Sequence, residues 1–170
     1  GSKGLLVKTT NSGMNWSLLP QLTNLDLNSI CFINENKGFI CADSGKIFVT
    51  SNGGINWTAQ NAGESHQNVE CVEFVDSLKG FIGMSSLLSG SNTNLYKTTD
   101  GGATWQNVYL TIVVISFTDI KFTNNLTGYV CSDNGPVMIT TNSGNIWRPY
   151  GLPPTTVMKS ISKLDTNVII

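Results

Sequence analysis

The sequence is short of charge. Only 12% of its 170 residues are Asp, Glu, Lys or Arg, and the formal net charge is -1. A protein that binds nucleic acid neutralises phosphates with a basic patch, and this chain has no run of basic residues that could form one. We therefore expect no nucleic-acid partner.

Long apolar runs are missing as well. A membrane-spanning helix needs 18 or more consecutive apolar residues, and the longest candidate, VYLTIVVISF at 108–117, is interrupted by polar residues. The sequence thus predicts no membrane span. A chain of this length fits one domain with a sizeable core better than two very small domains.

Residues typical of catalytic and metal sites are scarce. His66 is the single histidine, and general-base catalysis would also need a partner that orients its ring. The cysteines show neither C-x-x-C spacing nor a histidine cluster beside them. We expect them to act as small core hydrophobes, although two disulfides stay possible in an oxidising compartment. The four are Cys31, Cys41, Cys71 and Cys131. No metal or cofactor is predicted.

What the sequence has instead is repetition. A polar turn that ends in tryptophan occurs four times, as TTNSGMNW, TSNGGINW, TTDGGATW and TTNSGNIW. The four tryptophans are 41, 48 and 42 residues apart, which is the period of a propeller blade. Between them a second element recurs, with an apolar residue, a polar turn, glycine and an aromatic, as in FINENKGFIC at 32–41.

Each repeat reads as a four-stranded antiparallel meander. The second element gives two strands joined by a turn, and a third and a fourth strand flank the tryptophan-ended turn. No segment carries a helical period over a useful length, so the predicted fold is an all-β propeller. Its repeats are 28–68, 69–116, 117–157, and 158–170 together with 1–27, in one domain of residues 1–170.

The residues that recur in the turns have structural uses. We expect the Asp or Asn to accept hydrogen bonds from backbone N–H groups two or three residues further on, while glycine permits conformations closed to other residues. The tryptophan packs the hairpin against its blade. Because Asn replaces Asp in three copies of four, the turn does not preserve a catalytic carboxylate. This structural set comprises Asn11, Gly13, Trp16, Asn52, Gly54, Trp57, Asp100, Gly102, Trp105, Asn142, Gly144 and Trp147.

The pattern S/T-x-D/N-x-G-x-x-W resembles the Asp-box, also called the BNR repeat. With the segments GFICADSGKIFVTS and GYVCSDNGPVMITT, the repeats are most similar to those of photosystem II assembly and stability factor-like proteins, which recur in secreted bacterial proteins. Asp-boxes also occur in sialidases, in glucan-cleaving glycosidases and in sortilin-type receptors. The resemblance implies a propeller scaffold whose function lies outside the box, because many activities share this fold.

Two enzyme classes can be tested on the residues. Sialidases grip the substrate carboxylate with three arginines, and Arg148 is the single arginine here, which excludes that chemistry. A glycosidase needs two carboxylates on opposite sides of the sugar bond. Asp43 and Asp133 occupy equivalent positions in ADSG and SDNG, but forming those turns explains both. We expect no enzyme, and keep a lobe of an Asp-box glycoside hydrolase as the alternative.

A binding module is the interpretation that is left. The connections from each fourth strand to the next first strand vary between repeats, and so does the turn between second and third strands, so the end of the blades that carries both is free to specialise. We predict that this loop face binds a protein or a glycan through Glu64, His66, Tyr109, Arg148 and Tyr150. Richness in Asn, Ser, Thr and Gly with few charges is typical of extracellular or cell-surface bacterial domains.

The two ends of the sequence are complementary. Residues 168–170 followed by 1–16 align without a gap with 39–57, so the ends should share one blade. Two arrangements satisfy this: a ring of four blades closed within one chain, or a homodimer in which two chains exchange half-blades to form eight. The first is preferred because it needs no second molecule. An excerpt of a larger propeller is a third possibility.

Overall fold

A computed structural model describes the chain except for residues 87–92, 112–115, 134, 151–156, 165–166 and 170. After a 3₁₀ turn, η1 (Ser2–Gly4), the described secondary structure consists of β-strands. No helix among the described residues has the length and apolarity to cross a membrane. The prediction of an all-β chain is confirmed.

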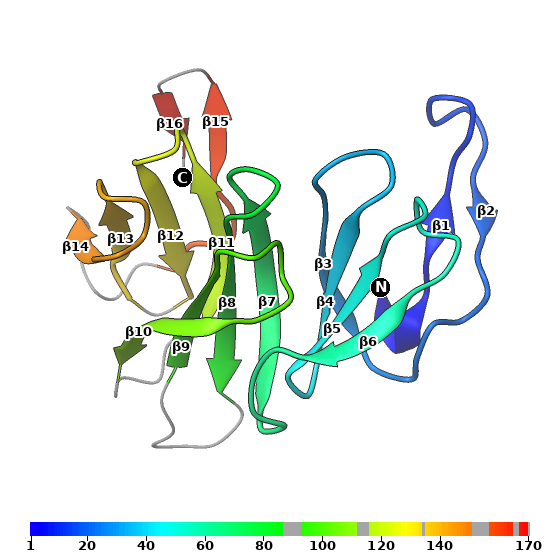
Figure 1. Cartoon of the computed structure of the whole chain (residues 1–170), viewed down its shortest axis with the longest axis horizontal. Coiled ribbons are helices and arrows are strands. Elements are labelled where there is room, and N and C mark those ends of the chain that lie inside the picture. The colour runs from blue at the N-terminus through cyan, green and yellow to red at the C-terminus, as the bar shows by residue number, and fades with distance from the viewer. Residues whose placement is uncertain (87–92, 112–115, 134, 151–156, 165–166, 170) are drawn as a thin grey trace.

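Three four-stranded antiparallel sheets, named blades 1, 2 and 3, form the body of the molecule (Figure 1). Blade 1 contains β3 (Leu27–Phe32), β4 (Gly38–Ala42), β5 (Lys46–Thr50) and β6 (Thr58–Asn61). Blade 2 contains β7 (Gln67–Phe74), β8 (Gly80–Ser86), β9 (Thr93–Thr98) and β10 (Gln106–Thr111). Blade 3 contains β11 (Phe117–Phe122), β12 (Gly128–Ser132), β13 (Val137–Thr140) and β14 (Arg148–Tyr150). Each strand pairs with its neighbour in the chain, so the predicted meander is confirmed in all three.

The fourth repeat is present as two separate two-stranded sheets. The N half-blade pairs β1 (Val7–Lys8) with β2 (Ser17–Leu18), and the C half-blade pairs β15 (Ser162–Leu164) with β16 (Asn167–Ile169). They lie at opposite ends of the row of blades and do not pair with each other among the described residues (Figure 1). Among the described residues, the expected shared blade is thus present as two halves that are not paired with each other.

Neighbouring blades are joined by a repeated stack of aromatic rings. Phe39 of blade 1 stacks on Phe74 of blade 2 with ring centroids 4.5 Å apart, and Phe81 of blade 2 stacks on Phe122 of blade 3 at 4.7 Å. The tryptophan of the second blade in each pair lies edge-on to the same rings. Trp147 of blade 3, for example, has its ring centroid 5.9 Å from that of Phe122. Phe39 and Phe81 are fully buried, so these rings form the centre of the core between blades.

The tryptophan-ended turns, here called tryptophan turns (residues 9–16, 50–57, 98–105 and 140–147), share one hydrogen-bond pattern. In the third turn Asp100 Oδ1 accepts from the backbone N of Thr104 at 2.9 Å and from Thr98 Oγ1 at 2.7 Å. Thr98 Oγ1 in turn accepts from the backbone N of Gly102 at 2.9 Å. The other three turns repeat these contacts with Asn in place of Asp.

Two sequence expectations for these turns need correction. The Asp or Asn side chain accepts from the N–H four residues further on, rather than two or three. The threonine that opens each turn, such as Thr98, is as much a part of the motif as the acid, because its hydroxyl links the acid to the glycine. The glycine itself is needed for its positive φ, which is 86° at Gly102.

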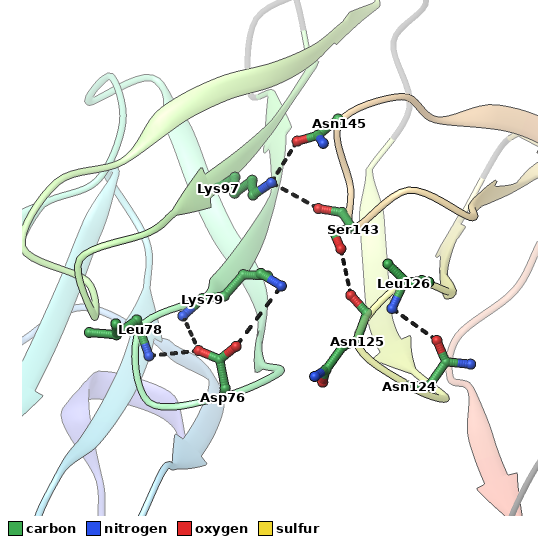
Figure 2. Close-up of polar contacts among 9 residues, drawn as sticks. All are labelled: Asp76, Leu78, Lys79, Lys97, Asn124, Asn125, Leu126, Ser143 and Asn145. Carbon is green, nitrogen blue, oxygen red and sulfur yellow. Dashed lines mark hydrogen bonds and ion pairs between the residues drawn. The ribbon is translucent and has the colours of Figure 1, made fainter.

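A lysine from the preceding blade holds two of the turns. Lys97 of β9 donates Nζ to the carbonyl of Ser143, at 2.8 Å, and to Oδ1 of Asn145, at 2.7 Å, in the turn of blade 3 (Figure 2). Lys8 of β1 donates in the same way to the carbonyl of Gly53 in the turn of blade 1, at 3.0 Å. These two turns thus contact both their own blade and the sheet that precedes it.

The ring stack predicts unequal costs for equivalent tryptophans. Trp147 is 6% exposed and contacts Phe81 and Phe122, whereas Trp16 is 61% exposed. We expect Trp147→Ala to lower the free energy of unfolding by about 3–5 kcal/mol, as other large core truncations do, and Trp16→Ala by less than about 0.5 kcal/mol. Urea unfolding of both variants measures this. Equal losses would show that the indole acts within its own turn and not at the junction.

Replacing the acid of the third turn should matter little. Asp100 is exposed, and hydrogen bonds from Thr104 hold the pKa of its carboxyl below the ordinary value. A lowered pKa in the folded state means that the carboxylate adds stability above about pH 4 and loses it as the pH falls further. Asp100→Asn keeps the Oδ1 acceptor, so we expect a small decrease in melting temperature at pH 7 that vanishes in acid. A decrease as large as that of Trp147→Ala would reveal a charge-dependent role.

Candidate functional site

The variable loops gather at the end of the blades opposite the tryptophan turns. The backbone N of Gly45, in the β4–β5 turn, donates to the carbonyl of Gln67 at 2.6 Å, and the N of Ala62 donates to the carbonyl of Gly45 at 2.8 Å. The second-to-third-strand turn and the connection between blades therefore lie side by side, as predicted. We call this end, with the starts of β3, β7 and β11, the loop end.

Each inner strand carries a β-bulge at the loop end. The register with the second strand shifts between Leu27 and Ser29, between Val69 and Cys71, and between Phe117 and Asp119. The extra residues are Asn28, Glu70 and Thr118. A bulge turns a side chain away from the regular alternation of the strand, so these three side chains are placed by the same backbone feature.

Two of the three bulge residues join their blade to the next one. Asn28 donates Nδ2 to the carbonyl of Val69, at 3.1 Å, and Thr118 donates Oγ1 to the carbonyl of Met158, at 2.7 Å. Glu70 has no proton to donate in this way when ionised. It instead accepts a hydrogen bond from Ser85 Oγ in its own blade at 2.5 Å. Glu70 therefore departs from the structural role of its equivalents.

Glu70 lies in an acidic setting. Burial is the largest influence that raises the pKa of its carboxyl, and the charges of Asp43 and Asp133 raise it further, against lowering influences from Ser85 and Lys159. Asp43 Oδ1 accepts from Asn28 Nδ2 at 3.0 Å, and Asp133 Oδ1 accepts from the backbone N of Ser116 at 2.8 Å. Asp43, Glu70 and Asp133, here called the acidic cluster, come from the loop ends of all three blades.

Further along the inner strands the charges are paired. Lys121 of β11 forms an ion pair with Glu73 of β7 at 3.1 Å, and its Nζ lies 3.8 Å from Asp119. Asp119 also accepts hydrogen bonds from Ser160 and from the backbone N of Ile161. Within the described part of the chain, Glu70 has no cation at ion-pair distance. Glu73 therefore has a lysine partner, whereas the contact described for Glu70 is the hydrogen bond from Ser85.

The sequence-predicted binding residues fall into two places. Glu64 is exposed and His66 half-buried in the connection that precedes β7, at the loop end. Arg148 and Tyr150 are exposed on β14, the outer strand of blade 3, where Tyr150 lies edge-on to Tyr129 with centroids 6.4 Å apart. In the described part of the chain, no hydrogen bond, ion pair or ring contact joins the two places.

Tyr109 and much of the long turn of blade 2 cannot be placed in the site. Tyr109 lies in β10, where its backbone pairs with Leu95 of β9, and its side chain is not among those that the structure describes. Residues 87–92 lie outside them as well. Sequence reasoning missed Glu70, because its signal is a carboxylate at a position that is Asn or Thr in the neighbouring repeats.

The cysteines are free thiols. Cys41, Cys71 and Cys131 are buried, Cys31 is half-buried, and burial raises the pKa of all four thiols. Their role as small core hydrophobes is confirmed by the clusters in which they pack. No group of three or more metal-ligating side chains occurs among the described residues.

Comparison with solved structures supports the fold. No family model matches the sequence, and no curated protein is similar to it. The structure of YCF48 bound to a D1 peptide aligns with a TM-score of 0.66 at 21% identity, over 81% of this chain and 44% of that one. An ancestral GH74 enzyme aligns at 0.73 and 17% identity, over 90% and 22%. YCF48 from Cyanidioschyzon merolae aligns at 0.61 and 18%, over 76% and 41%.

These likenesses define the class of fold. At such identities they concern architecture alone, and this chain spans less than half the length of each of the three. The chain has the fold of a β-propeller, with three complete blades and two half-blades in the described residues.

The setting of Glu70 predicts a cost to stability. A carboxyl whose pKa is raised by folding favours the folded state below the ordinary pKa of about 4.3, and this contribution is lost as the pH rises through the folded value. We expect Glu70→Gln to raise the melting temperature at pH 7 and to leave it unchanged at pH 3.5. Thermal melts at both values measure this. A lower melting temperature at pH 7 would mean that ionised Glu70 stabilises the fold.

Proposed function

We propose that this propeller is a non-enzymatic binding module that engages a protein segment at its loop end. The observation that carries the proposal is Glu70, a half-buried carboxylate without an ion-pair partner among the described residues, in the bulge position that Asn28 and Thr118 use to join blades. A residue that lowers the stability of the fold, at a position where its equivalents raise it, is typical of a functional site.

The chemistry of the acidic cluster favours a cationic ligand. Asp43, Glu70 and Asp133 present carboxylates from three blades, and a lysine or arginine side chain would supply Glu70 with a charge-assisted hydrogen bond. We therefore infer that the partner is a basic peptide segment, and a glycan is the other outcome. The likeness to YCF48, which was solved with a D1 peptide, supports a protein ligand.

The proposal also covers the type of repeat and the location of the protein. The tryptophan turns carry the Asp-box pattern in their hydrogen bonds as well as in their sequence, which favours a repeat of the BNR type like those of photosystem II assembly factors. With few charges and many Asn, Ser, Thr and Gly residues, we place the protein outside the cell or on the surface of a bacterium. Both assignments are hypotheses.

A glycoside hydrolase lobe is the second candidate, favoured by the likeness to GH74 enzymes. Asp43 and Asp133 would be its carboxylates, and each already accepts a hydrogen bond, Asp43 from Asn28 Nδ2 and Asp133 from the backbone N of Ser116. Reducing-sugar release from soluble β-glucans tests this candidate. Release that disappears in Asp43→Asn would favour the hydrolase, and no release favours the binding module.

Peptide binding tests the leading proposal. Fluorescence anisotropy of a labelled lysine-rich peptide should show binding that a glutamate-rich peptide of equal length lacks. Glu70→Gln should weaken it roughly tenfold, the loss of one charge-assisted hydrogen bond. Glu35→Gln, a matched change of charge at an exposed site by the tryptophan turns, should leave it unchanged.

Equal weakening by the two variants would indicate nonspecific attraction and contradict the proposal. The double variant Arg148→Ala/Tyr150→Ala separates the loop end from the outer strand. We expect it to retain binding, and its failure to bind while Glu70→Gln still binds would move the site to β14.

A further inference from the structure

Lys159 has the position in the fourth repeat that Glu70 has in blade 2. The carbonyl of Val69 accepts a hydrogen bond from the bulge residue of blade 1, and the carbonyl of Met158 accepts one, at 2.7 Å, from the bulge residue of blade 3. Met158 therefore corresponds to Val69, and both side chains are buried. Lys159 follows Met158 as Glu70 follows Val69. The two residues are thus equivalents in different repeats, and their charges are of opposite sign.

Hydrogen bonds to blade 3 hold the backbone on both sides of Lys159. The backbone N of Met158 donates to a carbonyl of β12 at 3.1 Å, and the backbone N of Ile161 donates to Asp119 Oδ2 at 2.9 Å. Ser160 Oγ donates to the same carboxylate oxygen at 3.0 Å. The backbone of Lys159 is therefore fixed at the loop end, beside the start of β11.

The charge of the loop end changes sign across β11. β7, the strand of Glu70, lies beside β11 (Figure 1), and the bulge residue of β11 is the uncharged Thr118. Burial is the largest influence on Glu70 and raises the pKa of its carboxyl, whereas the positive charge of Lys159 lowers that pKa. Within the described part of the chain, no carboxylate lies at ion-pair distance from Lys159. The loop end therefore presents a carboxylate and an ammonium group that act on each other.

A ligand that contacts both side chains needs charges of both signs. A lysine or arginine side chain suits Glu70, but a second basic side chain that reached Lys159 would be repelled. A carboxylate instead accepts charge-assisted hydrogen bonds from an ammonium group. Because like charges across an interface oppose binding, Lys159 discriminates against a segment whose basic residues continue past Glu70 across β11.

We propose that Lys159 is a specificity-determining residue of the loop end, and that the partner is a protein segment with a basic side chain for Glu70 and an acidic side chain for Lys159. This inference rests on the proposed function, because it assigns a second charged contact to the same site. Glu70 then provides the attraction for the basic residue, and Lys159 selects which basic segments are accepted.

Two labelled peptides of equal length test this specificity by fluorescence anisotropy. The mixed peptide carries lysines in one half and glutamates in the other, and the comparison peptide has glutamines in place of the glutamates. The mixed peptide should bind about two- to fivefold more tightly, which is the effect of one exposed ion pair. Lys159→Glu should reverse this preference, because it places a carboxylate opposite the glutamates. Lys159→Arg keeps the positive charge and should retain the preference.

Lys46→Glu is the matched control. Lys46 also lies at the loop end, at the start of β5, but its Nζ donates to Asn61 Oδ1 on the outer strand of blade 1 at 2.6 Å. The substitution changes the net charge by the same amount as Lys159→Glu, and we expect it to leave the preference for the mixed peptide unchanged. An equal loss of preference in both variants would indicate a general effect of net charge and overturn the inference.

The results separate this inference from the proposed function. If both peptides bind the unaltered protein equally and Glu70→Gln still weakens both, only the assignment of Lys159 is wrong. If neither of them binds and the lysine-rich peptide does not bind either, the binding module and the inference are both wrong. A titration of the Glu70 carboxyl by NMR needs no ligand. Lys159→Gln should raise the pKa of Glu70, since it removes a positive charge that lowers it, and an unchanged pKa would overturn the inference.

Discussion

The stacking of one phenylalanine from each blade on a phenylalanine and a tryptophan of the next blade is the contact on which the rest of the structure depends. Phe39 and Phe81 are fully buried in these stacks. A single meander has an apolar face that it cannot cover alone, and the stack covers it with a neighbour. This contact also requires glycine at Gly102 and Gly144, since the incoming ring leaves no room for a side chain there. The turn is conformationally costly, and its hydrogen bonds among Thr, Asp or Asn and glycine hold it in place.

The two ends of the blades have different roles. At the tryptophan turns every blade repeats the same contacts, and Lys8 and Lys97 extend them to the following blade. At the loop end the backbone repeats its bulge, but the side chains placed there differ, as Asn28, Glu70 and Thr118 do. A constant bulge with variable side chains allows the loop end to acquire a ligand without disturbing the aromatic stacks between blades.

The sequence predicted the blades well because the tryptophan period reports the length of a blade directly. It could not predict that the half-blades stay apart, because the alignment of 168–170 and 1–16 with 39–57 identifies complementary strands but contains no distance between them. Glu70 escaped notice for a similar reason. A bulge adds one residue to a strand and looks like an ordinary polar position, so its equivalence with Asn28 and Thr118 is visible only from strand register. Arg148 and Tyr150 looked like loop residues, and they lie on β14 instead.

The stack is directional, and this bears on how such a chain can lengthen during evolution. Each repeat contributes a ring from its second strand and receives a ring between its first strand and its tryptophan turn, so it carries both sides of one contact, as blade 2 does with Phe81 and Phe74. A duplicated gene segment of one repeat length therefore inserts a blade that already fits both of its neighbours. No compensating substitution is required at either new junction. Blade number can then change by recombination alone, and selection acts afterwards on the loop end.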